Sequence, residues 1–212
     1  MADEGALRPK EAYHHGDLGR ALVTAAAAII AEEGEDALTL RGVGQRLGVS
    51  RTALYRHFDG KAALLAAVAL EGFRHLRRDL EAALGAAEAA GADPIAGLLG
   101  AYIAFGAAHP AHYRTMFGPA LRGGEFGPDL TEAGHAAFGV LVGVIAGGQA
   151  AGRLAPGDPA RLAQVAWATV HGVVMLGDAG KLGPGSPAPE AGPGVAPLTA
   201  AVLLAGLLAR PG

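Results

Sequence analysis

Apolar residues recur at helical spacing along nearly the whole chain, and the alternation of apolar and polar residues that marks strands is scarce. Ala and Leu, which favour helices, supply most of the apolar positions. The pattern therefore predicts an all-α protein of about nine helices. With 212 residues, 51% of them hydrophobic and 17% charged, the chain is too apolar to be disordered and long enough to bury a core.

Several kinds of chemistry lack their usual residues. The chain has no cysteine, which excludes disulfides, zinc–thiolate sites and thiol nucleophiles. Serine occurs only at Ser50 and Ser186, and no carboxylate pair or His-x-x-x-His face stands out. We therefore expect no enzymatic activity, no catalytic residue, no metal site and no cofactor.

The high apolar content raises the question of a membrane protein. The longest uncharged stretches are residues 133–152, 162–177 and 191–209, and polar residues, Pro or several Gly interrupt each of them. A bilayer span needs about 20 mostly apolar residues, so we expect no membrane segment. Asp3 and Glu4 precede any apolar run, which is the reverse of a secretory signal. A cytoplasmic location is the resulting expectation.

Positive charge is concentrated in one short segment, although the whole chain carries a formal charge of -3. Residues 39–61 contain four arginines and Lys61, with Asp59 as the one acidic residue. A dense positive segment on an acidic protein is typical of a polyanion-binding site. On charge alone, a solvated helix face is the simpler interpretation.

The same segment contains residues that typically begin and end two short helices. Asp17 and Gly34 are expected to cap and end a first helix, and Thr39 to cap a second over residues 40–47. Gly48 ends that helix, and Ser50 caps a third that begins at Arg51 and runs to about residue 58. Two short helices joined by a tight glycine turn predict a helix-turn-helix motif over about residues 39–58.

The second helix of this motif presents groups suited to DNA. Arg51, Thr52, Tyr55 and Arg56 are expected on its outward face, where they can enter a major groove. Lys61 falls in the first turn of the next helix, where its ammonium group and free backbone amides can share a phosphate.

Residues 17–78 resemble the TetR/AcrR family of bacterial transcriptional regulators. The resemblance rests on the first helix ending in EEG, on Leu38-Thr39, on LGVS, and on ALYRHF followed by Lys61 and Leu64-Leu65. It implies an N-terminal arm (1–16), a three-helix DNA-binding domain (17–78) and a ligand-binding and dimerisation domain (79–212). It also implies DNA contacts at Thr39, Arg41, Ser50, Arg51, Thr52, Tyr55, Arg56, His57 and Lys61. Among these, Tyr55 and Lys61 correspond to phosphate contacts, and Arg51 and Thr52 to base readers.

Two features depart from the family pattern or need a separate interpretation. Gly42 and Gly44 fall inside the second helix, where each costs about 0.5 to 1 kcal/mol relative to Ala, so this helix is expected to fray without DNA. His14 and His15 lie in a lead-in seen in some members, and solvated histidines explain them better than a metal site.

The C-terminal half is similar to a subgroup of that family named for its Trp, His and Gly. Residues 109–117 and the stretch from Trp167 to Gly172 carry this similarity, and Trp167 and His171 share one helix face. Both side chains can line a ligand cavity or pack in a core, and the sequence leaves this open. The candidate pocket residues are Tyr102, Phe105, His109, His112, Tyr113, Met116, Phe117, Phe138, Trp167, His171 and Met175, with His135 beside them.

The last two helices are apolar on more than one side, which predicts burial by neighbours or by a second subunit. The resemblance implies a homodimer formed by these helices, although an intramolecular core remains the alternative. The resulting prediction is a DNA-binding regulator that is released as a repressor from a palindromic operator by a small molecule. An activator on the same fold is the alternative, and an enzyme or a membrane-associated helical protein fits less well. The sequence names no effector, operator or regulated gene.

Overall fold

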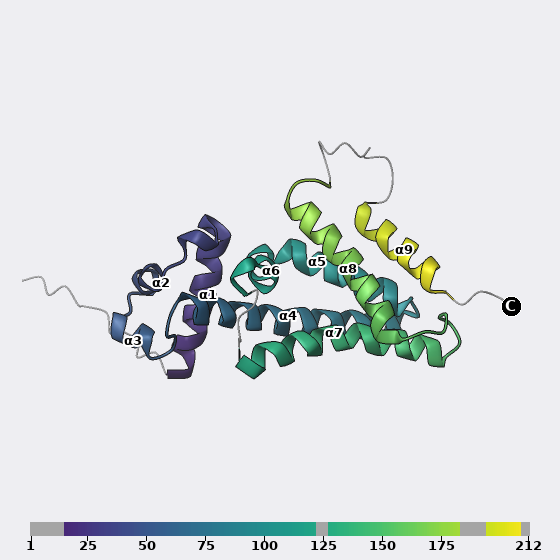
Figure 1. Cartoon of the computed structure of the whole chain (residues 1–212), viewed down its shortest axis with the longest axis horizontal. Coiled ribbons are helices and arrows are strands. Elements are labelled where there is room, and N and C mark those ends of the chain that lie inside the picture. The colour runs from purple at the N-terminus through teal and green to yellow at the C-terminus, as the bar shows by residue number, and fades with distance from the viewer. Residues whose placement is uncertain (1–14, 122–126, 183–193, 209–212) are drawn as a thin grey trace, which may run out of the picture. The chain divides into compact units, whose positions relative to one another are not determined.

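The structure is a computed structural model that describes residues 15–121, 127–182 and 194–208. Within these ranges every regular element is helical, apart from an isolated bridge between Leu154 and Leu208, so the all-α prediction is confirmed (Figure 1). The α-helices are α1 (His15–Glu33), α2 (Leu40–Leu47), α3 (Arg51–Tyr55), α4 (Lys61–Ala90), α5 (Pro94–Ala108), α6 (Pro110–Phe117), α7 (Gly127–Ala150), α8 (Pro159–Asp178) and α9 (Val195–Leu207). Short 3-10 turns form η1 (Glu35–Ala37) and η2 (Pro119–Leu121).

Side-chain caps set several of these boundaries. The hydroxyl of Thr39 accepts a hydrogen bond from the Gly42 amide at the start of α2, and that of Ser50 accepts one from Ala53 at the start of α3. Asp93 and Asp158 cap α5 and α8 in the same way. These caps satisfy amides that have no partner inside the helix.

Some helix ends differ from the sequence expectation. Helix α3 ends at Tyr55 and not near residue 58, and α4 begins at Lys61, whereas the sequence pattern predicts a start at Asp59. Helix α1 begins at His15, before its expected cap Asp17, and α9 begins at Val195, before the start near residue 198 that its apolar run predicts. The Gly, Pro and Ala composition of residues 177–197 predicts a surface loop, and residues 183–193 of this segment lie outside the described residues.

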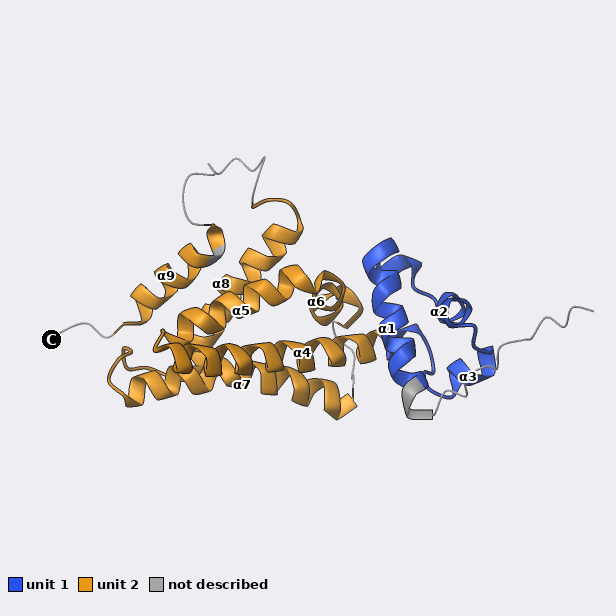
Figure 2. Ribbon diagram, turned by 180° about the vertical axis from the view of Figure 1, so that it is seen from behind, with its two compact units in different colours: residues 1–64 blue, residues 65–212 orange. Residues whose placement is uncertain are grey.

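The chain divides into two compact units, residues 1–64 and 65–212, and the division falls inside α4 (Figure 2). In the first unit α1 packs against α2 and η1, and α2 packs against α3. Leu22, Ile30, Leu38, Val43 and Leu54 are buried there. The family resemblance implies a domain boundary further on, after residue 78.

In the second unit α5 packs against α7, α8 and α9. Its largest fully buried side chains include Phe105, Tyr113, Ile145 and Val170. Gly106 of α5 lies so close to α8 that a methyl group added there would come within 2.3 Å of the Val174 side chain. This close approach fixes how α5 and α8 pack.

Helix α7 bears on the expectation that the chain has no membrane segment. By length and composition alone, this helix could cross a membrane, and it is the one such helix among the described residues. A helix that packs into a protein core passes the same test, so the signal is weak. Here α7 packs against α8 and α5 and buries Ala137, Leu141, Ile145 and Gly148.

Candidate functional site

The α2–α3 corner has helix-turn-helix geometry because of two glycines. Gly48 adopts a left-handed conformation with φ 65°, which ends α2 and lets the Val49 amide donate to the Gly44 carbonyl at 3.0 Å. A Cβ on Gly44 would lie 2.5 Å from Leu54 Cδ1. Gly44, a departure from the family pattern, therefore makes room for Leu54, which anchors α3 on α2.

A bidentate ion pair fixes α2 on α1. Arg46 donates to the two carboxylate oxygens of Glu32 at 2.6 and 2.7 Å, and this hydrogen bonding holds the pKa of Glu32 below its usual range. Arg46 is thus engaged within the protein, although it contributes to the positive charge of the segment.

The outward face of α3 carries the predicted DNA-reading groups. Arg51, Thr52, Tyr55 and Arg56 are exposed, whereas Leu54 is buried. The Arg51 guanidinium carbon lies 5.4 Å from the centroid of the Tyr55 ring, within the range of a cation–π contact. Arg51 and Tyr55 line a groove with Arg41 of α2, so three of the predicted contacts meet at one surface.

The remaining predicted DNA contacts have other partners inside the first unit. Thr39 and Ser50 are exposed, and their hydroxyls cap α2 and α3. The Lys61 ammonium donates to the Glu35 carbonyl oxygen at 2.7 Å. His57 is half-buried, and its ring faces Gly19 of α1.

The second unit contains an apolar cavity of about 380 Å³ between α4, α5, α7 and α8, which Phe117 at the end of α6 also lines. Four of the predicted pocket residues line it, namely Tyr102, Phe117, Phe138 and Trp167, together with His135. The wall also includes residues that are not among the pocket residues predicted from the sequence: Phe73, Leu76, Leu80, Leu98, Leu99, Gly134, Ala137, Leu141, Gln164 and Val170. The sequence shows that α4 has an apolar stripe, but it does not show that this stripe faces a cavity.

A chain of hydrogen bonds leads from the cavity wall into the core. The Trp167 indole N–H donates to the Tyr102 hydroxyl at 2.9 Å, and that hydroxyl lies 3.0 Å from the hydroxyl of Tyr113. The Tyr113 hydroxyl in turn lies 2.7 Å from Nδ1 of His171. Burial raises the pKa of Tyr102 to about 12 and the pKa of Tyr113 well above its usual range, and it lowers the pKa of His171. Both phenols therefore stay protonated at neutral pH, and His171 stays neutral.

The other predicted pocket residues do not line this cavity. Phe105, Tyr113 and Met116 are buried in the core, and Met175 is 42% exposed on α8. His171 stacks on Tyr113 and contacts Phe117. Helical spacing places these residues near the cavity but does not determine which of them face it.

His109 and His112 belong instead to a histidine cluster with His75, in which the ring centroids lie 5.7 to 6.1 Å apart. Nε2 of His112 is buried without a hydrogen-bond partner and lies 3.9 Å from a carboxylate oxygen of Glu71. Burial is the main cause that lowers the pKa of His112 and that of His75. Within the described ranges, no group of three or more His, Asp or Glu side chains is arranged to hold a metal ion.

Both halves of the chain match known families. Residues 22–68 match the family of bacterial regulatory proteins called the tetR family, and residues 95–192 match the tetracyclin repressor-like C-terminal domain. The comparison with curated proteins found no match. The Trp-His-Gly subgroup stays a prediction.

Solved structures agree over nearly the full length. A protein of unknown function from Rhodococcus sp. RHA1 is 33% identical with a TM-score of 0.78, over 94% of this chain and 100% of that one. A bacterial regulatory protein in the tetR family from Rhodococcus RHA1 is 20% identical with a TM-score of 0.63, over 91% and 98% of the two chains. The TetR family transcriptional regulator PfmR from Thermus thermophilus is 18% identical with a TM-score of 0.61, over 89% and 99%. The last two show the fold alone.

The helix-turn-helix unit and the helical unit with its cavity define a DNA-binding transcriptional regulator and not an enzyme. The chain belongs to the TetR family.

Proposed function

We propose that the protein is a repressor that leaves its operator when a small molecule enters the cavity of the second unit. The observation that carries this proposal is the cavity itself, about 380 Å³ in volume and lined by apolar side chains from α4, α5, α7 and α8. This volume falls in the range of small-molecule sites, and a few polar groups on an apolar wall are typical of them. A fully packed core would contain no such space.

For DNA binding, we propose the exposed surface of α2 and α3. Arg51 and Thr52 read bases, while Tyr55, Arg56 and Arg41 contact the backbone around them. Their exposure and the shared groove of Arg41, Arg51 and Tyr55 support this assignment. Thr39, Ser50, His57 and Lys61 complete the interface from the helix starts and from the residues that follow α3.

We further propose a homodimer formed by α8 and α9. Val165, Leu176, Leu198 and Val202 are large apolar residues on these helices that are 49 to 63% exposed in the single chain. Exposed apolar surface of this kind marks protein interfaces. A two-fold dimer presents its recognition helices to half-sites about one DNA turn apart, ~34 Å, so we expect the operator to be a pseudo-palindrome. We propose that the protein binds this operator in the cytoplasm.

Release of the protein from DNA would follow from thermodynamic linkage between the cavity and the DNA-binding surface. A ligand that binds more tightly to the conformer with the wrong half-site spacing lowers DNA affinity by the ratio of its two affinities. A ligand that binds both conformers equally changes nothing.

Selection of bound duplexes from a random pool at low salt tests the DNA-binding part. A recovered pseudo-palindrome supports the proposal, and recovery of no preferred sequence contradicts it. Val202→Glu should produce a monomer by sedimentation and lose operator binding, whereas Thr131→Glu on the exposed face of α7 should leave both unchanged. Transcription from the selected site with and without the protein then separates a repressor from an activator.

A further inference from the structure

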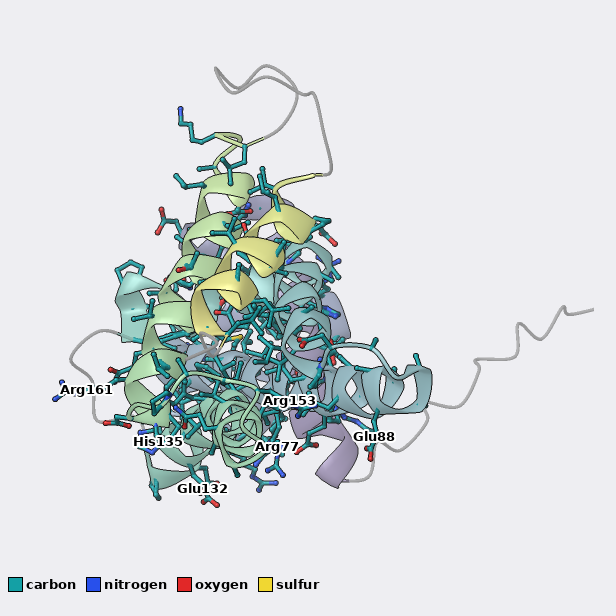
Figure 3. The ribbon with its side chains drawn as sticks, turned by 90° about the vertical axis from the view of Figure 1, so that its right-hand side faces the viewer. Arg77, Glu88, Glu132, His135, Arg153 and Arg161 are labelled. Carbon is teal, nitrogen blue, oxygen red and sulfur yellow. The ribbon has the colours of Figure 1, made fainter. Side chains whose placement is uncertain are left out.

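The cavity wall constrains the chemistry of its ligand. Among the described residues that line it, none is Lys, Arg, Asp or Glu. The nearby charged residues Arg74, Arg77, Asp129 and Glu132 line a second hollow that shares only Phe73 with the cavity (Arg77 and Glu132 are labelled in Figure 3). An anionic ligand in the cavity would lose its hydration and meet no Lys or Arg, because the only other polar side chains among the described wall residues are the His135 imidazole and the Gln164 amide, besides Tyr102 and Trp167; this desolvation is costly. The wall therefore selects uncharged molecules.

The hydrogen-bond chain also sets which polar group the wall can offer. The indole N–H of Trp167 can only donate, so the Tyr102 oxygen accepts it. The Tyr102 hydroxyl proton then has a buried acceptor in the Tyr113 oxygen, and the Tyr113 proton has one in His171 Nδ1. In the opposite direction the Tyr102 proton would have no partner among the residues that the structure describes, and an unpaired buried donor is unfavourable.

One lone pair of the Tyr102 oxygen stays free in this arrangement. The Tyr102 oxygen accepts from Trp167 with one lone pair and its proton goes to Tyr113, so its second lone pair has no donor among the described residues. Both Tyr102 and Trp167 line the cavity, so the group available there at Tyr102 is an acceptor.

We propose that the effector of this cavity is an uncharged, mainly hydrophobic molecule with a hydroxyl group that donates a hydrogen bond to the Tyr102 oxygen. The inference rests on the proposed effector role of the cavity and adds the chemical class of the effector. Tyr113 acts as a positioning residue, because it does not line the cavity and influences the ligand only by holding the Tyr102 proton.

Three probes of nearly equal size test the proposal: octan-1-ol, methyl heptyl ether and octanoate. The alcohol and the ether contain the same atoms, but only the alcohol can donate. Trp167 is the one tryptophan of the chain and lies at the cavity wall, so its fluorescence reports binding to the full-length protein without DNA, and calorimetry checks the affinities. We expect the alcohol to bind about tenfold more tightly than the ether, and octanoate to bind at least about tenfold more weakly than the alcohol at pH 7.5.

Two variants test the direction of the hydrogen-bond chain. Tyr102→Phe removes the acceptor and leaves the Trp167 N–H free to donate, so the affinity ratio of alcohol to ether should fall about tenfold, to near one. Tyr113→Phe frees the Tyr102 proton towards the cavity and should lower the same ratio, although residue 113 lies outside the wall. Thr24→Val removes an exposed hydroxyl of α1 in the first unit, has no assigned role in binding, and is the control that should keep the wild-type ratio. Thermal unfolding of each variant verifies that it is folded.

The outcomes separate this proposal from the proposed function. Equal binding of alcohol and ether to the wild-type protein, tighter binding of octanoate, or no binding of the alcohol overturns the proposal. An unchanged ratio in folded Tyr113→Phe also overturns it. Release of the protein from its selected operator is measured separately, so a protein that prefers the alcohol but stays on DNA refutes ligand release and leaves the ligand class standing.

Discussion

The ammonium group of Lys61 donates a 2.7 Å hydrogen bond to the backbone carbonyl of Glu35. The first residue of α4 is thereby tied to η1, the turn that follows α1. A predicted phosphate contact therefore also has a structural partner in the absence of DNA. Substitutions at this position affect two properties that must be measured separately.

Lys61→Ala should weaken binding to all DNA sequences alike. Loss of one phosphate contact reduces the slope of log K against log salt by ~0.9, and loss of the Glu35 hydrogen bond lowers the free energy of unfolding by about 0.5 to 1.5 kcal/mol. Salt titrations of operator and random duplex test the slope, and urea unfolding tests the stability. A normal slope in the variant would show that Lys61 contacts no phosphate.

Arg51→Ala should relax base preference at one position per half-site, at a cost of about 1 to 3 kcal/mol on the cognate base. Arg46→Ala is the matched control, because the Arg46 guanidinium is paired with Glu32 and an exposed pair of this kind contributes little to stability. Binding to operators substituted at each position distinguishes the two. Relaxed base preference in Arg46→Ala would show that it is not confined to its ion pair.

Gly106→Ala should destabilise the second unit by about 1 to 3 kcal/mol, because the new methyl group would lie 2.3 Å from a Val174 methyl. Gly100→Ala on the same helix meets no heavy atom within 4 Å and should stabilise the protein by about 0.5 to 1 kcal/mol. Urea denaturation of the pair measures both. Equal midpoints would mean that α5 and α8 can separate without cost.

The free energy of unfolding should fall as the pH drops below about 6.5, the ordinary histidine pKa. Burial lowers the pKa of His112, so the unfolded chain takes up a proton there before the folded one does. The stabilisation is fully present above the unfolded pKa and is lost as the pH falls through the folded pKa. Glu71 favours the charged form of His112, whereas His75 and His109 oppose it.

Urea midpoints at pH 7.5 and 5.5 test this prediction. The wild-type protein should lose stability between the two, and His112→Met should lose less, because it removes one of the titrating groups. A wild-type protein that gains stability on acidification would contradict the burial argument.

Local signals predict much of this fold. Thr39 and Ser50 accept the capping hydrogen bonds that their positions suggest, and the helices after them start where expected. The pairs Asp93-Pro94 and Asp158-Pro159 are likewise typical of a cap followed by proline at the first helical position, and α5 and α8 start there. Such caps act over two or three residues and can be recognised directly in the sequence. Helix α9 has no side-chain cap, and it starts before the residue that its apolar pattern predicts.

Long-range packing accounts for the features that the sequence does not predict. Gly44 is recognisable in the sequence only as a weak point of α2, because its close contact with Leu54 comes from the next helix. Likewise, helical spacing groups Trp167 with His171, but only the packing of α8 on its neighbours puts Trp167 at the cavity wall and His171 behind it. The chain from Trp167 through Tyr102 to Tyr113 joins three helices and has no signature in the sequence.

The shortness of α3 limits how much of an operator one subunit can identify. Its five residues rise about 7.5 Å along the helix axis, which corresponds to roughly two base-pair steps of DNA. So short a stretch recurs by chance throughout any genome. In the dimer that we propose, the distance between two half-sites must therefore supply much of the sequence specificity that one α3 lacks, and a change in the distance between the two recognition helices would abolish recognition without altering a single base contact.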